Sequence, residues 1–122
     1  MIKGIGIDSL EIYRMEKAII RHGNKFSKKI FTLQEWEYCQ KSSRPAASLA
    51  ARFAAKEAVV KVLGADWRYL RWKEIEVLSE KGRPSLKIYG GTFLEAKNKG
   101  ITTWHVSLTH DKERAIAVVL AE

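Results

Sequence analysis

The sequence predicts an α+β fold in which helices pack on a small antiparallel sheet. Helical patterns dominate the first half of the chain and strand patterns dominate the second half, a separation that is typical of α+β proteins. The chain has 122 residues, of which 46% are hydrophobic and only two are proline. A chain of this length and composition is expected to form one domain, over residues 1–122, around one hydrophobic core.

The first elements expected are a strand and a helix. Residues 2–8 alternate apolar residues with small or polar ones, which predicts a strand that ends at Asp8. Beyond it, apolar residues from Leu10 to Ile20 recur at mostly helical spacing, and the residues 22–24 (HGN) are expected to end that helix. A short apolar turn should follow over residues 26–31.

Two more helices are expected before the middle of the chain. Thr32 and Glu35 form the capping-box signature, which predicts a helix through about Gln40. A loop is expected over residues 41–45. Residues 46–63 are rich in alanine and contain no glycine or proline, and Gly64 is placed to cap the C-terminus of this longest helix.

The second half predicts two hairpins with a helix between them. Strands are expected over residues 72–78, 86–89, 101–110 and 114–121, with turns over residues 80–84 and 111–113. Between the hairpins, Thr92 and Glu95 repeat the capping-box signature and predict a short helix through Asn98.

Charge and cysteine content limit the function classes. The formal net charge of +8 predicts an acidic partner, which could be nucleic acid, anionic lipid, a phosphorylated ligand or an acidic protein. No apolar run approaches the roughly 20 residues that span a bilayer, so no membrane partner is expected. The single cysteine, Cys39, cannot form an intramolecular disulfide, and the opening MIKGIGID lacks the apolar core of a signal peptide. We therefore expect a cytoplasmic protein.

The longest helix carries charges in an otherwise apolar segment, RFAAKEAVVKVLG. On a helical wheel, Glu57 falls within about 40° of both Phe53 and Lys61, so its carboxylate leaves an apolar face. Arg52 and Lys56 lie together on a neighbouring side. From spacing alone, an ordinary ion pair between Glu57 and Lys61 is the more common explanation. If the carboxylate of Asp8 lies nearby, the two acids and phosphate oxygens could instead hold Mg²⁺.

Four motifs together resemble one known family. They are GIGID at residues 4–8, RFAAKEA at 52–58 with Lys61 and Gly64 beyond it, KGRP at 81–84, and HVSLTH at 105–110. In this order, and over essentially the whole chain, they resemble the holo-acyl-carrier-protein synthase family, the small bacterial 4′-phosphopantetheinyl transferases.

The resemblance implies an enzyme. Members transfer the 4′-phosphopantetheine arm of coenzyme A to a serine of an acyl carrier protein and release adenosine 3′,5′-bisphosphate. By similarity, Asp8 and Glu57 bind Mg²⁺ and Lys61 meets the pyrophosphate, so these three are the expected catalytic residues. Glu57, directly or through a water, is the candidate for accepting the serine proton.

The resemblance also implies contacts with coenzyme A. The expected residues are Arg52, Phe53, Lys61, Gly64, Gly82, Pro84 and His105. Without the family, His105 would be interpreted as a half-buried strand histidine, although alternation places it on one face with Ser107 and Thr109. The sequence departs from the family after Gly64, where Ala65-Asp66-Trp67 replaces a glycine-threonine-glycine loop. The contacts of that loop are left open.

Assembly and the carrier partner follow from the same resemblance. Family members are trimers with the coenzyme between neighbouring subunits, so we expect a homotrimer with the fold of 4′-phosphopantetheinyl transferases. Arg14, Lys17 and Arg21 form a basic stripe that starts one turn beyond Asp8, and an acidic carrier protein is expected to dock there. Whether that carrier serves fatty-acid or polyketide synthesis is left open.

The sequence also suggests two alternative functions. A nucleic-acid-binding module is suggested by the charge and by residues 67–73 (WRYLRWK), where aromatic residues alternate with basic ones. That reading gives Asp8 and Glu57 no role, and nucleic acid is therefore not the expected partner. The second alternative is a carrier-protein-binding subunit without catalytic activity.

Overall fold

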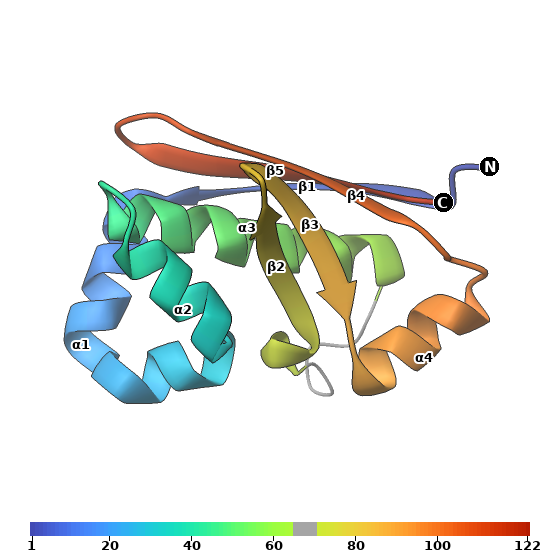
Figure 1. The fold of residues 1–122 in the computed structure, drawn as a ribbon, viewed down its shortest axis with the longest axis horizontal. Helices are drawn as coiled ribbons and strands as arrows, with labels where there is room; N and C mark the ends of the chain where they lie inside the picture. The colour runs from blue at the N-terminus through green and yellow to red at the C-terminus, as the bar shows by residue number, and fades with distance from the viewer. Residues whose placement is uncertain (65–70) are drawn as a thin grey trace.

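The computed structural model describes residues 1–64 and 71–122, and its helices lie below a long sheet (Figure 1). The elements in chain order are β1 (Gly4–Glu11), α1 (Ile12–Ile30), α2 (Leu33–Gln40), α3 (Pro45–Leu63), the 3₁₀ turn η2 (Trp72–Glu74), β2 (Ile75–Glu80), β3 (Arg83–Ile88), α4 (Gly90–Asn98), β4 (Trp104–His110) and β5 (Arg114–Ala121). The α+β prediction is confirmed.

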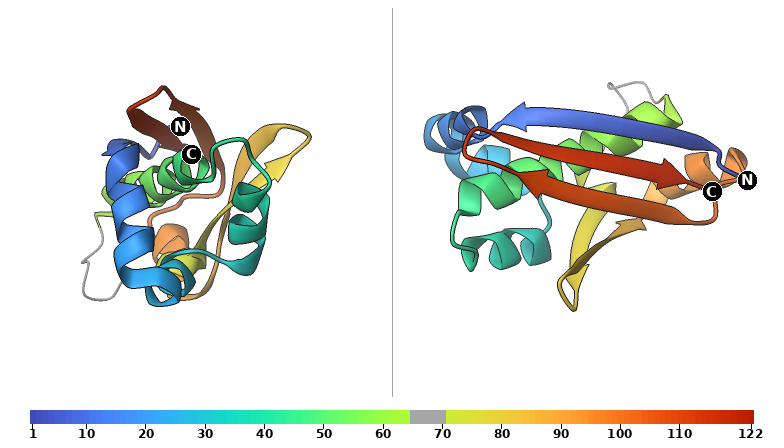
Figure 2. Two further views of the ribbon diagram at one scale, coloured as in Figure 1. Left: turned by 90° about the vertical axis from the view of Figure 1, so that its left-hand side faces the viewer. Right: turned by 90° about the horizontal axis from the view of Figure 1, so that it is seen from above.

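The strands form two antiparallel sheets rather than one. The larger sheet has the order β1-β5-β4, and its strands run side by side above α3 (Figure 2). Strands β2 and β3 form a separate hairpin that lies against the side of α3. Both predicted hairpins are therefore present. The pairing of β1 with the last strand, β5, could not be predicted from local sequence patterns.

Helix α3 is the centre of the core. Most of its surface is buried, including Leu49, Ala54 and Val59, because the larger sheet, the β2–β3 hairpin and helices α1 and α2 pack against it. Its many alanines allow close packing. At Gly6 on β1, an added Cβ would collide with the carbonyl oxygen of Ala58, so the strand backbone lies directly against the helix.

Several predicted boundaries were wrong. Strand β1 runs on to Glu11 instead of ending at Asp8, because it pairs with β5 over its whole length. The predicted stop over residues 22–24 does coincide with a break in α1, because Gly23 is non-helical (φ 53°, ψ −135°). Beyond it the chain forms helix again to Ile30, where only an apolar turn was expected. Trp72 lies in the turn η2 rather than in a strand.

One of the two predicted capping boxes is confirmed. Thr32 and Glu35 cap α2 reciprocally, with both hydrogen bonds present. The second was wrong, because α4 begins at Gly90 and Thr92 lies inside it, buried. The Thr92 hydroxyl donates to Glu74 Oε1 at 2.9 Å. The Glu74 carboxylate, which comes from η2, also accepts from the backbone N–H groups of Gly91 and Thr92 and so caps α4 in place of the predicted box.

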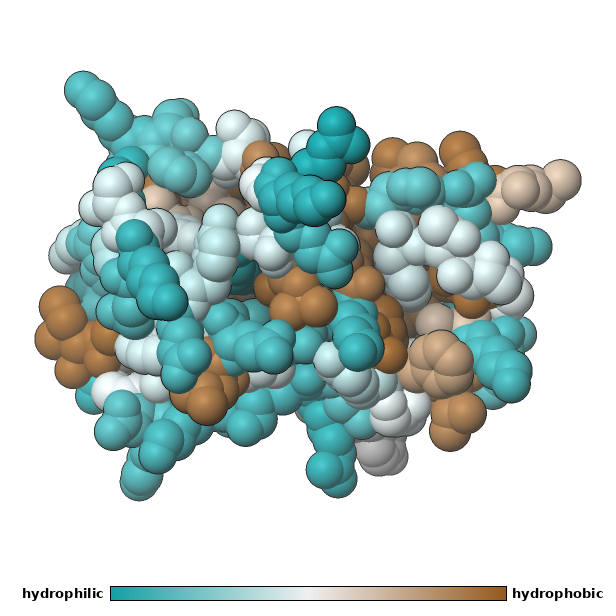
Figure 3. All heavy atoms as spheres, viewed as in Figure 1, coloured by the Kyte–Doolittle hydropathy of each residue, from teal (hydrophilic) through white to brown (hydrophobic). Residues whose placement is uncertain are grey.

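The upper face of the larger sheet is open and apolar. Ile5, Ile7 and Ile116 are exposed there, and Val118 and Leu120 are half-buried. Hydrophobic residues show at the right-hand part of the upper edge of the molecule, where this sheet lies (Figure 3). Within residues 1–64 and 71–122, no helix is long and apolar enough to cross a membrane.

Candidate active site

Asp8, Glu57 and Lys61 meet where β1 crosses α3. Gly4 and Gly6 face α3, so alternation along the strand turns Asp8 toward the helix as well. Lys61 lies one helical turn beyond Glu57 and donates from Nζ to Asp8 Oδ1 at 2.9 Å. The same Nζ donates to the carbonyl oxygen of Ile7 at 2.9 Å. The structure thus brings together the three residues predicted to be catalytic.

The acid pair has unusual electrostatics. Burial, a hydrogen bond with Asp8 and the negative charge of Asp8 together raise the pKa of Glu57 to about 7, although Lys61 opposes the shift. The Asp8 side chain is only 12% exposed, whereas that of Lys61 is 52% exposed. The site therefore holds one excess negative charge near solvent when Glu57 is ionised, and a cation would stabilise that state.

The donor set suits a hard divalent cation. In the described part of the chain no group of three or more His, Cys, Asp or Glu side chains could hold a metal ion. Two neighbouring carboxylates match Mg²⁺, which typically takes one or two protein carboxylates and fills its octahedral shell with water and phosphate oxygens. Asp8 and Glu57 fit that ion, and they leave room for a phosphate ligand.

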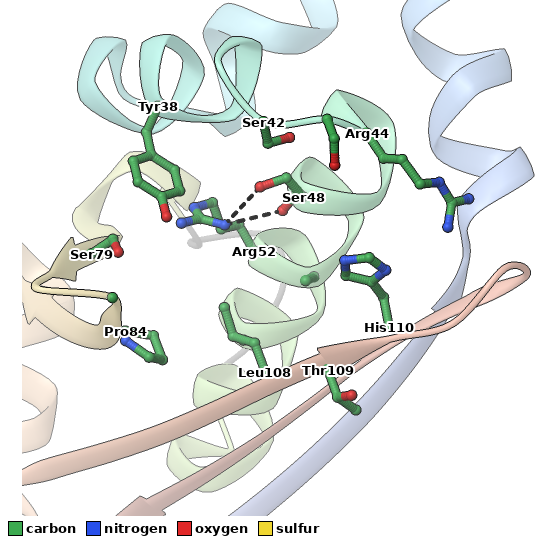
Figure 4. Close-up of a pocket in the computed structure, with 13 residues that line it drawn as sticks. Tyr38, Ser42, Arg44, Ser48, Arg52, Ser79, Pro84, Leu108, Thr109 and His110 are labelled. Carbon is green, nitrogen blue, oxygen red and sulfur yellow. Dashed lines mark hydrogen bonds between the residues drawn. The ribbon is translucent and has the colours of Figure 1, made fainter.

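The predicted coenzyme contacts divide between two sides of α3. Arg52 lines a hollow of about 380 Å³ together with Gly82 and Pro84, which belong to the β2–β3 hairpin (Figure 4). Lys61 lies nine positions after Arg52, which places the two side chains about 180° apart around the helix. Accordingly, Asp8, Glu57 and Lys61 do not line this hollow.

Three other predicted contacts have different surroundings. Phe53 is half-buried, with its ring centroid 5.0 Å from that of Trp72. Gly64 caps α3 in the left-handed conformation (φ 65°, ψ 27°), as predicted. His105 does not line the hollow that contains Arg52, and its Nε2 lies 2.7 Å from Glu122 Oε1. Within one chain, His105 and Arg52 are thus not brought together.

The basic stripe on α1 faces solvent. Arg14, Lys17 and Arg21 are all exposed. Lys17 Nζ lies 5.0 Å from the centroid of the Tyr13 ring, and Arg14 forms a long contact of 3.8 Å with Glu11. Because all three side chains are exposed, their positive charges are accessible to a partner.

Sequence reasoning missed a buried ion pair between Lys56 and Glu35, both with fully buried side chains. Lys56 Nζ donates to Glu35 Oε1 at 2.7 Å and to the carbonyl oxygen of Ile30 at 2.8 Å. Burial lowers the pKa of Lys56, and Glu35 opposes that effect. The available signal was a lysine in the alanine-rich segment of α3, but its partner lies 21 positions away in the sequence.

Two sequence features lie wholly or partly outside the described residues. The departure at Ala65-Asp66-Trp67 is outside them, as is most of the aromatic and basic run at residues 67–73. At the described end of that run, Trp72 is half-buried and packs on Phe53, so this ring does not form an exposed stacking surface.

The chain is similar to known proteins over nearly its whole length. A model of the 4′-phosphopantetheinyl transferase superfamily matches residues 4–119. The holo-[acyl-carrier-protein] synthase of Halothermothrix orenii is 43% identical, with 100% of this chain and 98% of the relative covered. That of Syntrophus aciditrophicus is 44% identical, with 100% and 97% covered.

Solved structures carry the same fold. The crystal structure of the holo-[acyl-carrier-protein] synthase from Neisseria meningitidis superposes with a TM-score of 0.87 at 30% identity, covering 100% of this chain and 99% of the other. The enzyme from Helicobacter pylori, solved in complex with coenzyme A, gives a TM-score of 0.84 at 29% identity, covering 97% and 99%.

Proposed function

The chain belongs to the 4′-phosphopantetheinyl transferase superfamily, as a holo-[acyl-carrier-protein] synthase, and we propose how its residues divide that reaction. It transfers the 4′-phosphopantetheine group of coenzyme A to a serine of an acyl carrier protein. The observation that carries the assignment of the site is the meeting of Asp8, Glu57 and Lys61 beside β1.

Asp8 and Glu57 are the proposed ligands of Mg²⁺. Their proximity and the raised pKa of Glu57 mark a place where a divalent cation relieves repulsion between two carboxylates. Bound there, Mg²⁺ supplies Lewis-acid polarisation of the phosphate under attack.

The side chains then have separate roles in the transfer. The serine oxygen bonds to the phosphorus that carries the pantetheine arm, and the bond from that phosphorus to the bridging oxygen breaks, releasing adenosine 3′,5′-bisphosphate. Glu57, directly or through a water, accepts the serine proton, since a positioned carboxylate can act as a general base. Lys61, half-exposed beside Asp8, donates to the pyrophosphate and stabilises the charge on the leaving group.

The coenzyme is proposed to bind between two chains of a homotrimer. Arg52, Gly82 and Pro84 lie on the opposite side of α3 from Lys61, so one chain presents its two groups of coenzyme contacts in opposite directions. The open apolar face of β1-β5-β4 supports such an assembly, because burying exposed apolar surface drives association. In this arrangement Arg52, Gly82 and Pro84 contact the nucleotide end from one chain, and His105 contacts it from another.

The carrier protein is proposed to dock on α1. Arg14, Lys17 and Arg21 offer an exposed positive stripe on α1, the helix that directly follows β1. An acidic carrier would be steered to this stripe and held with its serine near the acid pair. We also propose a cytoplasmic location, which agrees with the free thiol of Cys39.

Mass spectrometry tests the proposal. An apo acyl carrier protein is incubated with coenzyme A, Mg²⁺ and this protein, and its mass should rise by one phosphopantetheine group. A carrier that binds but gains no mass would favour the subunit without catalytic activity. Tight, salt-sensitive binding of nucleic acid with no transfer would favour the nucleic-acid-binding module.

A further inference from the structure

A second hollow, of about 270 Å³, lies between α1, α2 and η2. Its apolar lining consists of Phe31, Leu33 and Trp36, and the exposed residues Lys28 and Lys73 also line it. The three elements around it lie below α3, on the side away from the larger sheet (Figure 1). The hollow thus combines an apolar interior with positive charge at a place that the proposed reaction does not use.

The bases around this hollow have no carboxylate partner. Lys29 and Arg71 line an adjoining hollow that shares Lys73, and we call Lys28, Lys29, Arg71 and Lys73 the basic rim. All four are exposed, and no ion pair within residues 1–64 and 71–122 includes any of them. Among the described lining residues of both hollows the single acid is Glu74, whose carboxylate accepts from the start of α4. The basic rim is therefore free to attract an anionic partner.

Hydrogen bonds hold the walls of the hollow in place. The buried Lys56 Nζ donates to the carbonyl oxygen of Ile30, at the end of α1, and to that of Trp72, in η2. It also donates to Glu35 Oε1 on α2. One cation thus ties together the three elements that surround the hollow. A preformed site loses little conformational entropy when a partner binds.

The shape of the hollow favours a protein segment over nucleic acid or a membrane. Bases stack on exposed aromatic faces, but Phe31 is 3% exposed and Trp36 is half-buried, so the accessible apolar residue is Leu33 (71% exposed). A membrane surface is entered by protruding apolar side chains, whereas these residues line a concavity. An acidic protein segment can insert one apolar side chain there and surround it with carboxylates.

The acyl carrier protein is not the expected occupant. On α3, Lys56 points to the elements around the hollow, whereas Glu57 and Lys61 lie about 100° and 140° further around the helix. The non-helical Gly23 also separates the half of α1 that lines the hollow from the half that carries the basic stripe. A carrier docked on that stripe, with its serine at the acid pair, would leave the hollow available to a second protein.

We propose that this hollow binds an acidic segment of a protein other than the acyl carrier protein. One large apolar side chain of the segment inserts between Phe31, Leu33 and Trp36, and its carboxylates pair with the basic rim. The inference does not depend on the roles proposed for the acid pair. Because the hollow is separate from that pair and from the open sheet face, the enzyme keeps its activity while it is attached to this partner.

A designed peptide tests the proposal by fluorescence anisotropy with the full chain. The probe is a labelled helix of about 18 residues, built from alanine and glutamate with one central leucine. The same peptide with alanine at the central position should bind at least about fivefold more weakly, because it lacks the apolar anchor. Lys28→Glu and Lys73→Glu should each weaken binding of the leucine peptide at least about fivefold. Lys97→Glu, an equal change of charge on α4, is the matched control and should bind normally.

Leu33→Glu separates this site from general attraction to a basic protein. The variant should fold, because Leu33 is exposed and an acid is favourable in the first turn of α2, and it should not bind the leucine peptide. Saturating peptide should leave the transfer rate and KM for the carrier unchanged. Equal binding of both peptides, or an equal loss in Lys97→Glu, would overturn the proposal.

Three competitors identify a different occupant. Displacement of the peptide by the apo acyl carrier protein would assign the hollow to the carrier. Displacement by single-stranded DNA or by phosphatidylglycerol vesicles, when Leu33→Glu abolishes their binding, would assign it to nucleic acid or to a membrane. Each of these results would contradict the proposed protein partner.

Discussion

At the scale of single residues, the acid pair makes the most direct prediction. Asp8→Ala or Glu57→Ala should abolish transfer, because each variant removes one of two proposed ligands of Mg²⁺. Neither carboxylate is central to the hydrophobic core, so circular dichroism should show an intact fold. Glu37→Ala, an exposed acid on α2, is the control and should retain activity. Near-normal turnover by Glu57→Ala at limiting Mg²⁺ would disprove the assignment.

The raised pKa of Glu57 predicts a pH effect on stability without divalent metal. The folded carboxyl titrates at about 7, whereas its ordinary value is 4.5. A raised acid pKa means that the folded state binds the proton more tightly, so the stabilising contribution is complete below about pH 4.5 and is lost as pH rises through about 7. Urea unfolding should show the wild type losing stability relative to Glu57→Gln over this range. A constant difference between the two proteins would contradict the shift.

At the scale of elements, α3 is anchored by a buried charge pair. Lys56→Met should lower the free energy of unfolding by about 3–5 kcal/mol, because it leaves the Glu35 carboxylate buried without its cation. The double variant Lys56→Met, Glu35→Gln should regain part of that loss, as measured by urea unfolding. Arg14→Met, which breaks an exposed contact with Glu11, is the control and should cost less than about 1 kcal/mol.

Helix α1 makes a prediction about the carrier protein. Reversing Arg14 and Arg21 to glutamate should raise KM for the carrier at least roughly tenfold, about 1.4 kcal/mol, with a much smaller change in KM for coenzyme A. Added salt should weaken the wild-type interaction in the same direction, since exposed charges are screened. Equal effects on both substrates would mean that this stripe is not the docking surface.

The helices and strands differ in how much of their structure the sequence could predict. Periodicity and capping signals located every helix and strand of the described chain approximately, and wheel geometry with motif similarity brought Asp8 and Glu57 together. Local patterns could not identify partners that are distant in the sequence. The Glu74 carboxylate, rather than a Thr92 cap, accepts the hydrogen bonds at the start of α4. Glu35 pairs with Lys56, which lies 21 positions later in the chain. Similarly, spacing could not show that Arg52 and His105 lie apart within one chain.

At the scale of the whole molecule, the open sheet face predicts an oligomer. Ile5 is 67% exposed on that face, so Ile5→Lys should cost the isolated chain little but disrupt a trimer formed there. Light scattering should report a trimer for the wild type and smaller species with little transfer activity for the variant. Leu94→Lys, 59% exposed on α4, should leave both mass and activity unchanged. A fully active wild-type monomer would refute the shared site.

The contact between Gly6 and α3 has a consequence for mutational tolerance. Every substitution at a glycine adds at least a Cβ, and here that atom would collide with the backbone oxygen of Ala58. Position 6 therefore has no conservative replacement: even alanine would push β1 away from α3 and shift Asp8 relative to Glu57. Gly64 differs, because its left-handed backbone has open space around it and asparagine can adopt that conformation. Of these two glycines, Gly6 is the one whose substitution would separate the carboxylates of Asp8 and Glu57 in the active site.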